Sequence, residues 1–165
     1  MQAWANFKNE FEHALLSLIN DWPDHAKKIN AIACGMIGAR EGWVEAIYKM
    51  VPCKPFQVEV TVAPVEDPRL NFFVIPGLVQ LNPSEDVMRG EETQISSFLL
   101  QNPNFDGVIR LPGTHTKWVH VIAGEIASFL NSLTGELFSL ICNQSVLCNS
   151  LTESRWDKTT LSTRL

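Results

Sequence analysis

The sequence of 165 residues predicts an α/β fold in which mixed sheets are flanked by helices. Apolar residues recur every three or four positions in several segments, as on the buried face of a helix. Short runs rich in β-branched and aromatic residues lie between these segments and are typical of strands. No internal repeat or low-complexity stretch interrupts this order, so the chain has the mixed pattern of an α/β protein.

The first half of the chain is predicted to hold one helix and two strands. Apolar residues from Trp4 to Trp22 follow helical spacing. Residues 29–34 read as a short buried strand that the Gly35-x-x-Gly38 turn stops, and residues 72–75 form a second strand before a Pro-Gly pair. Residues 42–55 are expected to belong to a long connection.

The second half is predicted to hold two helices and three strands. Residues 91–100 have helical spacing, and residues 107–111 form a strand that a second Pro-Gly pair closes. A β-hairpin follows over residues 117–130. An apolar helix over residues 137–147 ends the pattern, with Thr134 as its expected N-cap.

The composition is that of an ordinary globular protein. Hydrophobic residues make up 45% of the chain and charged residues 19%, with a formal net charge of −5. Disordered chains are poorer in apolar residues, and no stretch approaches the roughly 18 apolar residues of a membrane span. The densest basic spot, Lys27-Lys28, cannot neutralise a line of phosphates. We therefore exclude nucleic acid and membranes as partners and expect small molecules or other proteins.

The cysteines predict a reducing, cytoplasmic setting. Cys34, Cys53, Cys142 and Cys148 form no C-x-x-C pair, and no signal peptide is visible at the start of the sequence. Free buried thiols are therefore the expected state. Length alone indicates one domain, because a chain of this size can bury most of the surface that it exposes when unfolded.

Four short polar, glycine-bearing segments lie at the ends of predicted elements, where ligands bind in α/β sheets. They are residues 34–43, 86–94, 111–118 and 133–137. In the third, Gly113-Thr114-His115 and Lys117 would place backbone N–H groups, hydroxyls and an ammonium around one concavity suited to phosphate. A solvated loop whose threonines bond their own backbone is an equal alternative. The common nucleotide cradles, G-x-x-x-x-G-K-[ST] and G-x-G-x-x-G, are absent.

The second segment contains a candidate general base. Glu91 and Glu92 open a predicted helix directly after Gly90, so either could accept a proton from an attacking hydroxyl. The alternative is that both acids only complement the positive end of the helix dipole. Arg89 could bind a carboxylate or phosphate through two hydrogen bonds, or it is a surface arginine.

Metal-centred and serine-hydrolase chemistry find no support in the sequence. His115 has no second histidine, cysteine or acid at ligand spacing, so we expect a hydrogen-bonding histidine and no metal ligand. The G-x-S-x-G nucleophile turn is also absent. An unrelated α/β hydrolase is therefore excluded.

Several motifs together resemble those of the 2-dehydro-3-deoxygalactonokinase family. The longest are M-R-G-E-E-T-Q, which begins at Met88, and P-G-T-H-x-K-W-V, which begins at Pro112. The others are A-C-G-M-I-G with a following Gly-Trp, then I-P-G and L-T-G-E-L. They occur in the family's order from about residue 10 to residue 150.

This resemblance implies a partial actin-like (ribonuclease H-like) two-lobe sugar kinase. Such an enzyme would use ATP and Mg²⁺ to phosphorylate the terminal hydroxyl of 2-dehydro-3-deoxy-D-galactonate. The gluconate-type keto acid remains an open alternative, since no residue can be assigned to the one hydroxyl that differs. The implied site residues are Glu91 or Glu92 as catalytic base, Gly113, Thr114, His115 and Lys117 for phosphate, and Arg89, Arg40 and Gly35 for the substrate.

The resemblance also predicts how the chain divides. Residues 1–104 would form part of the N-terminal lobe with its cleft-lining helix, and residues 105–165 the start of the C-terminal lobe with a phosphate-binding hairpin. Neither the Asp-x-Gly-Thr turn of sugar kinases nor their glycine-rich adenosine segment is found, so we expect a chain truncated at both ends. The alternative is a non-catalytic remnant that binds sugar acid or a partner, with self-association into a homo-oligomer as one form.

Overall fold

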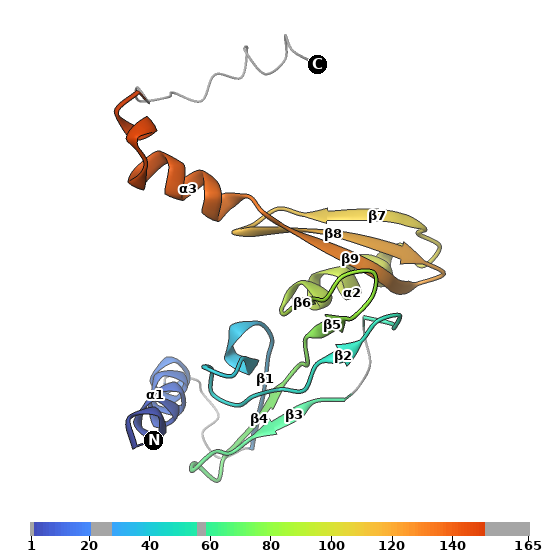
Figure 1. Ribbon diagram of the computed structural model, residues 1–165. Coiled ribbons are helices and arrows are strands. Elements are labelled where there is room, and N and C mark those ends of the chain that lie inside the picture. The colour runs from blue at the N-terminus through green and yellow to red at the C-terminus, as the bar shows by residue number, and fades with distance from the viewer. Residues whose placement is uncertain (1, 21–27, 56–58, 151–165) are drawn as a thin grey trace.

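A computed structural model describes residues 2–20, 28–55 and 59–150 (Figure 1). Within these residues the strands form three three-stranded sheets, and α2 lies between the second and the third (Figure 1). In chain order the elements are α1 (Gln2–Ile19), β1 (Ile29–Ala33), the 3-10 turn η1 (Met36–Gly38), β2 (Lys49–Met50), β3 (Thr61–Ala63), β4 (Leu70–Val74), β5 (Leu78–Gln80), β6 (Asp86–Met88), α2 (Glu91–Gln101), β7 (Gly107–Leu111), β8 (His115–Ile122), β9 (Glu125–Leu133), α3 (Gly135–Gln144) and η2 (Val146–Ser150).

The first sheet has β4 at its centre, parallel to β1 and antiparallel to β3. One face of this sheet packs against α1 and the segment that follows η1. Trp43 is buried there, with its ring centroid 4.3 Å from that of Phe72 and 6.4 Å from that of Phe11 of α1. The same cluster buries Ala46, Ala63, Leu70 and Val74.

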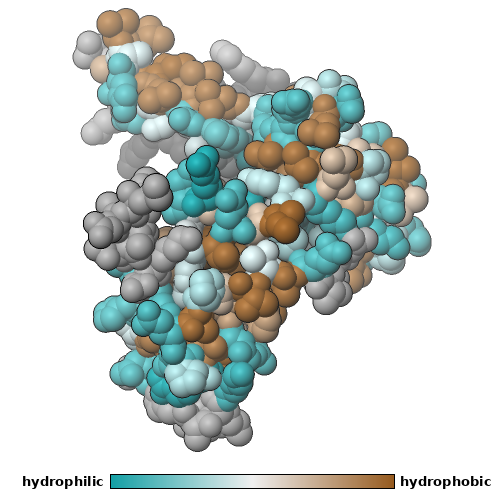
Figure 2. Space-filling view, turned by 60° about the horizontal axis from the view of Figure 1, so that its bottom comes forward, coloured by the Kyte–Doolittle hydropathy of each residue, from teal (hydrophilic) through white to brown (hydrophobic). Residues whose placement is uncertain are grey.

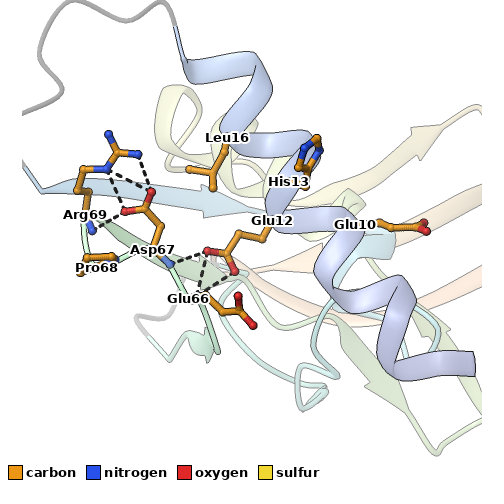
Figure 3. Close-up of a pocket in the computed structure, with 8 residues that line it drawn as sticks. All are labelled: Glu10, Glu12, His13, Leu16, Glu66, Asp67, Pro68 and Arg69. Carbon is orange, nitrogen blue, oxygen red and sulfur yellow. Dashed lines mark hydrogen bonds and ion pairs between the residues drawn. The ribbon is translucent and has the colours of Figure 1, made fainter. Parts of the chain in front are cut away.

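A buried carboxylate fastens α1 to the turn between β3 and β4. Glu12 accepts hydrogen bonds from the backbone N–H of Glu66 at 2.9 Å and of Asp67 at 2.8 Å (Figure 3). Hydrogen bonds from the Arg69 side chain to Asp67 lower the pKa of that carboxyl to about 2. Glu12 therefore holds the helix against this turn, while the pair of Asp67 and Arg69 lies within the turn itself.

The second sheet (β2, β5, β6) and the third (β7, β8, β9) share one core with α2. Ile95 and Leu99 of α2 pack there with Val119 and Val121 of β8. The buried side chain of Gln80 joins the two sheets, because its amide donates to the carbonyl of Phe129 at 3.0 Å and accepts from the N–H of that residue at 2.7 Å. Gln80 thus satisfies the backbone of β9, an edge strand of the third sheet.

The strongly patterned elements of the sequence are confirmed. The predicted segments correspond to α1, β1, β4, α2, β7, the β8–β9 hairpin and α3, with ends that differ by three residues or fewer. Trp22, the predicted last residue of the first helix, lies outside the described residues. The last helix ends earlier than predicted, at Gln144. The hydroxyl of Ser145, the next residue, donates to the carbonyl of Ile141 at 2.7 Å and accepts the N–H of Leu147 at 3.1 Å, and such side-chain bonds compete with those of the helix.

The connection predicted over residues 42–55 is corrected by the structure. β2 lies within it and pairs in parallel with β5, and Cys53 forms a bridge with Ile126 of β9. β3, β5 and β6 also have no counterpart in the prediction. Each of these four strands has two or three residues, too few to display an alternating pattern.

The prediction of buried thiols holds for one cysteine only. Cys53 is buried, and that burial raises the pKa of its thiol. Cys34 is exposed, while Cys142 and Cys148 are half-buried. Of the described helices, none has the length and apolar content needed to cross a membrane.

The last helix projects away from the sheets and carries an uncovered apolar surface. None of the residues of α3 is buried within the described chain, and Phe138 is 71% exposed. Apolar side chains gather over this part of the molecule in Figure 2. The apolar periodicity that predicts α3 therefore does not correspond to a core face in the described residues.

The shared core around α2 makes a stability prediction. We expect Ile95→Ala to lower the free energy of unfolding by about 2–5 kcal/mol, because it leaves a cavity where a fully buried side chain packs. Leu100→Ala, five residues further along the same helix and 74% exposed, should change it by less than about 0.5 kcal/mol. Urea unfolding followed by circular dichroism measures both, and equal losses would contradict the packing described above.

Candidate active-site cleft

All four polar segments identified in the sequence contribute to one cleft. Its volume is about 1200 Å³, and its walls come from the turn after β1, the β6–α2 junction, the β7–β8 turn and the end of β9. Seven predicted site residues line it: Arg40, Arg89, Glu91, Gly113, Thr114, His115 and Lys117. Two others, Gly35 and Glu92, are not among the lining residues.

Two glycines bring the end of β1 against the start of α2. Gly35 and Gly90 both have positive φ, +85° and +109°, which side chains other than that of glycine rarely adopt. A Cβ placed on Gly90 would lie 3.2 Å from the Cα of Gly35. This close backbone approach sets the position of Glu91, the next residue along the chain.

Glu91 is tied to the β7–β8 hairpin by an ion pair. Its Oε1 lies 2.7 Å from Nζ of Lys117, and its Oε2 accepts the backbone N–H of Arg89 at 3.2 Å. Nζ of Lys117 also donates to the carbonyl of His115 at 3.4 Å. The two side chains are 22% and 11% exposed, so the pair lies in the wall of the cleft and is partly accessible from it.

Glu92 has a different role from its neighbour. The residue is 1% exposed, and its Oε2 accepts the backbone N–H of Gly90, the N-cap residue of α2, at 2.6 Å, so a first-turn side chain reaches back to hold the start of the helix. Oε1 accepts the hydroxyl of Thr93 at 3.3 Å. Burial raises the pKa of this carboxyl. Of the two acids, Glu91 alone lines the cleft.

Arg89 is held by the protein itself. Its Nη2 donates to the carbonyl of Ala46 at 2.9 Å, and its guanidinium carbon lies 4.1 Å from the centroid of the Tyr48 ring. Its Nη1 is buried without a partner among the described residues, at the place where Gly38 leaves room for it. Arg40 lines the same cleft, is exposed, and forms no hydrogen bond or ion pair within the described chain.

The β7–β8 turn is braced by the first turn of α3. The carbonyl of Gly113 accepts the N–H of Gly135 at 3.3 Å, and Nε2 of His115 lies 2.6 Å from Oε2 of Glu136. Thr134 occupies the N-cap position as predicted but makes no capping bond, because its hydroxyl pairs with that of Thr116 at 2.6 Å. His115 is a hydrogen-bonding histidine, as expected.

Two cleft residues have no role assigned to them from the sequence. Asp86 at the start of β6 accepts the N–H of Asn131 in β9 at 3.0 Å and the side-chain amide of Asn131 at 2.5 Å. The same amide donates to the carbonyl of Val87 at 2.8 Å. Asp86 opens a recognisable polar segment, but nothing in a strand sequence marks Asn131 as its partner.

The described residues contain no ready-made metal centre. Among them, no group of three histidine, cysteine, aspartate or glutamate side chains could hold a metal ion. Both oxygens of Asp86 are taken by Asn131 and by the N–H of Val87. The donor set of the cleft therefore does not fit a metal held by protein ligands alone.

The chain is similar to known proteins along most of its length. A family model described as 2-keto-3-deoxy-galactonokinase matches residues 3–163. The probable 2-dehydro-3-deoxygalactonokinase of Rhizobium meliloti (strain 1021) is 35% identical over 124 residues, covering 74% of this chain and 40% of that protein. The 2-dehydro-3-deoxygalactonokinase of Escherichia coli (strain K12) is 34% identical over 134 residues, covering 81% of this chain and 44% of that protein.

The fold is similar to that of a solved protein. A crystal structure of a Sinorhizobium meliloti protein, provisionally described as a 2-dehydro-3-deoxygalactonokinase, matches with a TM-score of 0.75 at 31% identity. The match covers 94% of this chain and 50% of that one. The chain thus spans half or less of the length of each of these relatives.

The buried Glu92 predicts a pH dependence of stability. Its raised pKa means that the folded state binds this proton more tightly than the unfolded chain does. The free energy of unfolding should therefore fall as pH rises from the unfolded value, about 4.3, through the raised one. Glu92→Gln should lack this component of the fall, because an amide does not titrate yet can still accept the Gly90 N–H.

Urea unfolding between pH 4 and pH 8 tests this expectation. The exposed Glu85→Gln serves as the control for the loss of one carboxylate. A wild-type pH dependence that Glu92→Gln leaves unchanged would show that the protonation of Glu92 is not linked to folding.

Proposed function

The chain belongs to the 2-keto-3-deoxy-galactonokinase family, and from that premise we propose that its cleft binds sugar acid and transferred phosphate in an ATP-dependent kinase. The substrate would be 2-dehydro-3-deoxy-D-galactonate, phosphorylated on its terminal hydroxyl. The observation that carries the proposal is the 2.7 Å ion pair between Oε1 of Glu91 and Nζ of Lys117. Through it the motif that begins at Met88 and the motif that begins at Pro112, the two longest in the sequence, are in contact. A base and a phosphate site need this proximity for phosphoryl transfer.

Glu91 is the proposed general base. The substrate hydroxyl oxygen would form a bond to the γ-phosphorus of ATP as the bond between that phosphorus and the β,γ-bridging oxygen breaks. The hydroxyl proton would pass to the Glu91 carboxylate, leaving ADP and the phosphorylated sugar acid. Glu92 is not proposed for this role, because its carboxylate is buried against the backbone of Gly90.

The β7–β8 turn is the proposed phosphate-binding element. Gly113 and Thr114 line the cleft, and the carbonyls of both are held by the backbone of α3, which fixes the conformation of the turn. His115 braces the turn through Glu136, and Lys117 supplies positive charge beside it. Positioning and charge neutralisation of this kind supply most of the catalysis in phosphoryl transfer.

Arg40 is the proposed partner of the substrate carboxylate. It lines the cleft and has no other charge to satisfy within the described residues. Arg89 is better suited to positioning, because Ala46 and Tyr48 already hold its guanidinium. Gly35 would act through its contact with Gly90 and not by touching the substrate.

Magnesium and the adenosine of ATP have no assigned ligands in this proposal. Mg²⁺ in kinases is usually held by one or two carboxylates together with substrate phosphates. Because Asp86 is committed to Asn131 and Val87, and Glu91 to Lys117, we derive no step through a metal ion.

The lobe organisation stays part of the proposal. We propose an actin-like arrangement with residues 1–104 in one lobe and residues 105–165 in the other. The core around α2 contains residues from both sides of that boundary, so the two proposed lobes would be in contact there. A cytoplasmic setting and homo-oligomer formation also remain proposals. The non-catalytic alternative gains no support from the relatives, because each is named as a kinase.

The assignment of the base makes a kinetic prediction. Glu91→Gln should lower kcat for the keto acid by about 10²–10⁴-fold with little change in KM, since an amide cannot accept the hydroxyl proton. Glu85→Gln, which removes an exposed carboxylate outside the cleft, should retain normal turnover. A coupled assay of ADP release measures both, and near-normal turnover by Glu91→Gln would remove Glu91 from the mechanism.

The assignment of Arg40 makes a separate prediction. Arg40→Met should raise KM for the keto acid about 10–100-fold with kcat little changed, as expected for the loss of one charged hydrogen bond of about 1.5–3 kcal/mol. The substrate analogue with a carboxamide in place of the carboxylate should bind equally poorly to both proteins. Arg110→Met, on β7 beside Trp118, is the matched control. An unchanged KM for Arg40→Met would assign the carboxylate to another residue.

A further inference from the structure

We propose that Lys117 is a positioning residue that couples phosphate binding at the β7–β8 turn to the carboxylate of Glu91. The inference rests on the proposed function and adds a physical link between its two halves. Phosphate at the turn would draw the ammonium of Lys117 away from Glu91 and so change the hydrogen bonding and orientation of the carboxylate that is to accept the substrate proton.

The strand that carries Lys117 delivers its side chain to this position. Val119 and Val121 point into the core shared with α2, and side chains alternate along a strand, so Lys117 lies on the same face of β8. Lys117 is next to Val119 in that row, at the place where the core opens into the cleft. Its side chain is 11% exposed, and an ammonium so little solvated requires partners of its own.

The partners of Lys117 belong to different elements of the cleft. Nζ of Lys117 lies 2.7 Å from Oε1 of Glu91 in α2, and it donates to the carbonyl oxygen of His115, at the start of β8, at 3.4 Å. An ammonium has three donor hydrogens, so the third can first meet an oxygen of a bound phosphate, whose greater negative charge would then pull Nζ from Glu91 towards the turn. Lys117 is also the only lysine among the described residues that line the cleft.

The carboxylate of Glu91 depends on Lys117 for its orientation. Its two oxygens accept hydrogen bonds from Lys117 and from the N–H of Arg89, which fix the plane of the carboxylate while each oxygen keeps a second lone pair. A phosphate carries more negative charge than a carboxylate and would compete for the same ammonium. Glu91 would then keep its contact with the N–H of Arg89 while its other oxygen loses its hydrogen bond to the ammonium.

Carbon-detected NMR of the full chain, labelled with ¹³C at glutamate carboxyls, tests this coupling with inorganic pyrophosphate as the probe. The Glu91 signal is identified by its absence from Glu91→Gln. In the wild-type protein it should shift with pyrophosphate along the same binding curve as the backbone amides of Gly113 and Thr114. Arg110→Met, which removes a positive charge outside the cleft, should respond as the wild type does.

Variants of Lys117 separate coupling from a merely structural role. In Lys117→Met the Glu91 signal should no longer respond, and pyrophosphate should bind at least about tenfold more weakly, the loss of one charge-assisted hydrogen bond. Lys117→Arg should restore part of the response, because it retains the charge. A Glu91 response in Lys117→Met equal to that of the wild type would overturn the inference.

The titration of the wild-type protein also distinguishes failure of the coupling from failure of the proposed phosphate site. If the turn amides shift while Glu91 stays silent, the coupling is wrong and the proposed function is unaffected. If neither the amides nor Glu91 respond to pyrophosphate or to ATP, the phosphate assignment of the proposed function fails, and the coupling fails with it.

Discussion

The position of α2 between two sheets is the constraint on which the cleft depends. Ile95 and Leu99 bury one side of the helix against β8, so its N-terminus cannot shift without opening the shared core. Gln80 locks the same two sheets together by satisfying the backbone of Phe129. Glu91, at the first position of α2, is thereby held against a strand that is distant in sequence. Burial of an apolar helix face thus places a carboxylate in the wall of the cleft.

Most of the charged side chains around the cleft serve the fold and leave few for a ligand. Glu92 caps α2, Arg89 braces the segment at Ala46 and Tyr48, and Asp86 joins β6 to Asn131 of β9. Charged groups that are buried or half-buried need such partners, because desolvation without them is costly. The presence of a charged side chain in the cleft therefore does not by itself show that the residue binds a substrate. The hydrogen bonds and ion pairs that each side chain already makes within the protein indicate better which groups are left for a ligand.

The candidate site could be predicted better than the roles within it. The motif around Met88 and the motif around Pro112 are recognisable because glycines, acids and basic residues stand close together in sequence. Whether Glu91 or Glu92 faces the cleft depends on which of two adjacent side chains the helix buries, and both have the same chemistry. Arg40 and Arg89 are distinguished only by Tyr48 and Ala46, which come from a different part of the chain.

Local patterning by itself determined the α/β class and the long elements, because helical and alternating periodicities arise from burial of one face and are written in consecutive residues. It also singled out the four short polar segments whose residues line the cleft. The short strands β2, β3, β5 and β6 follow from pairing in three dimensions, because two or three residues are too few to show a periodicity and gain their conformation from the strands beside them. The ion pair of Glu91 with Lys117 was likewise decided in three dimensions, since 26 positions of chain separate its members and a shared core brings them together.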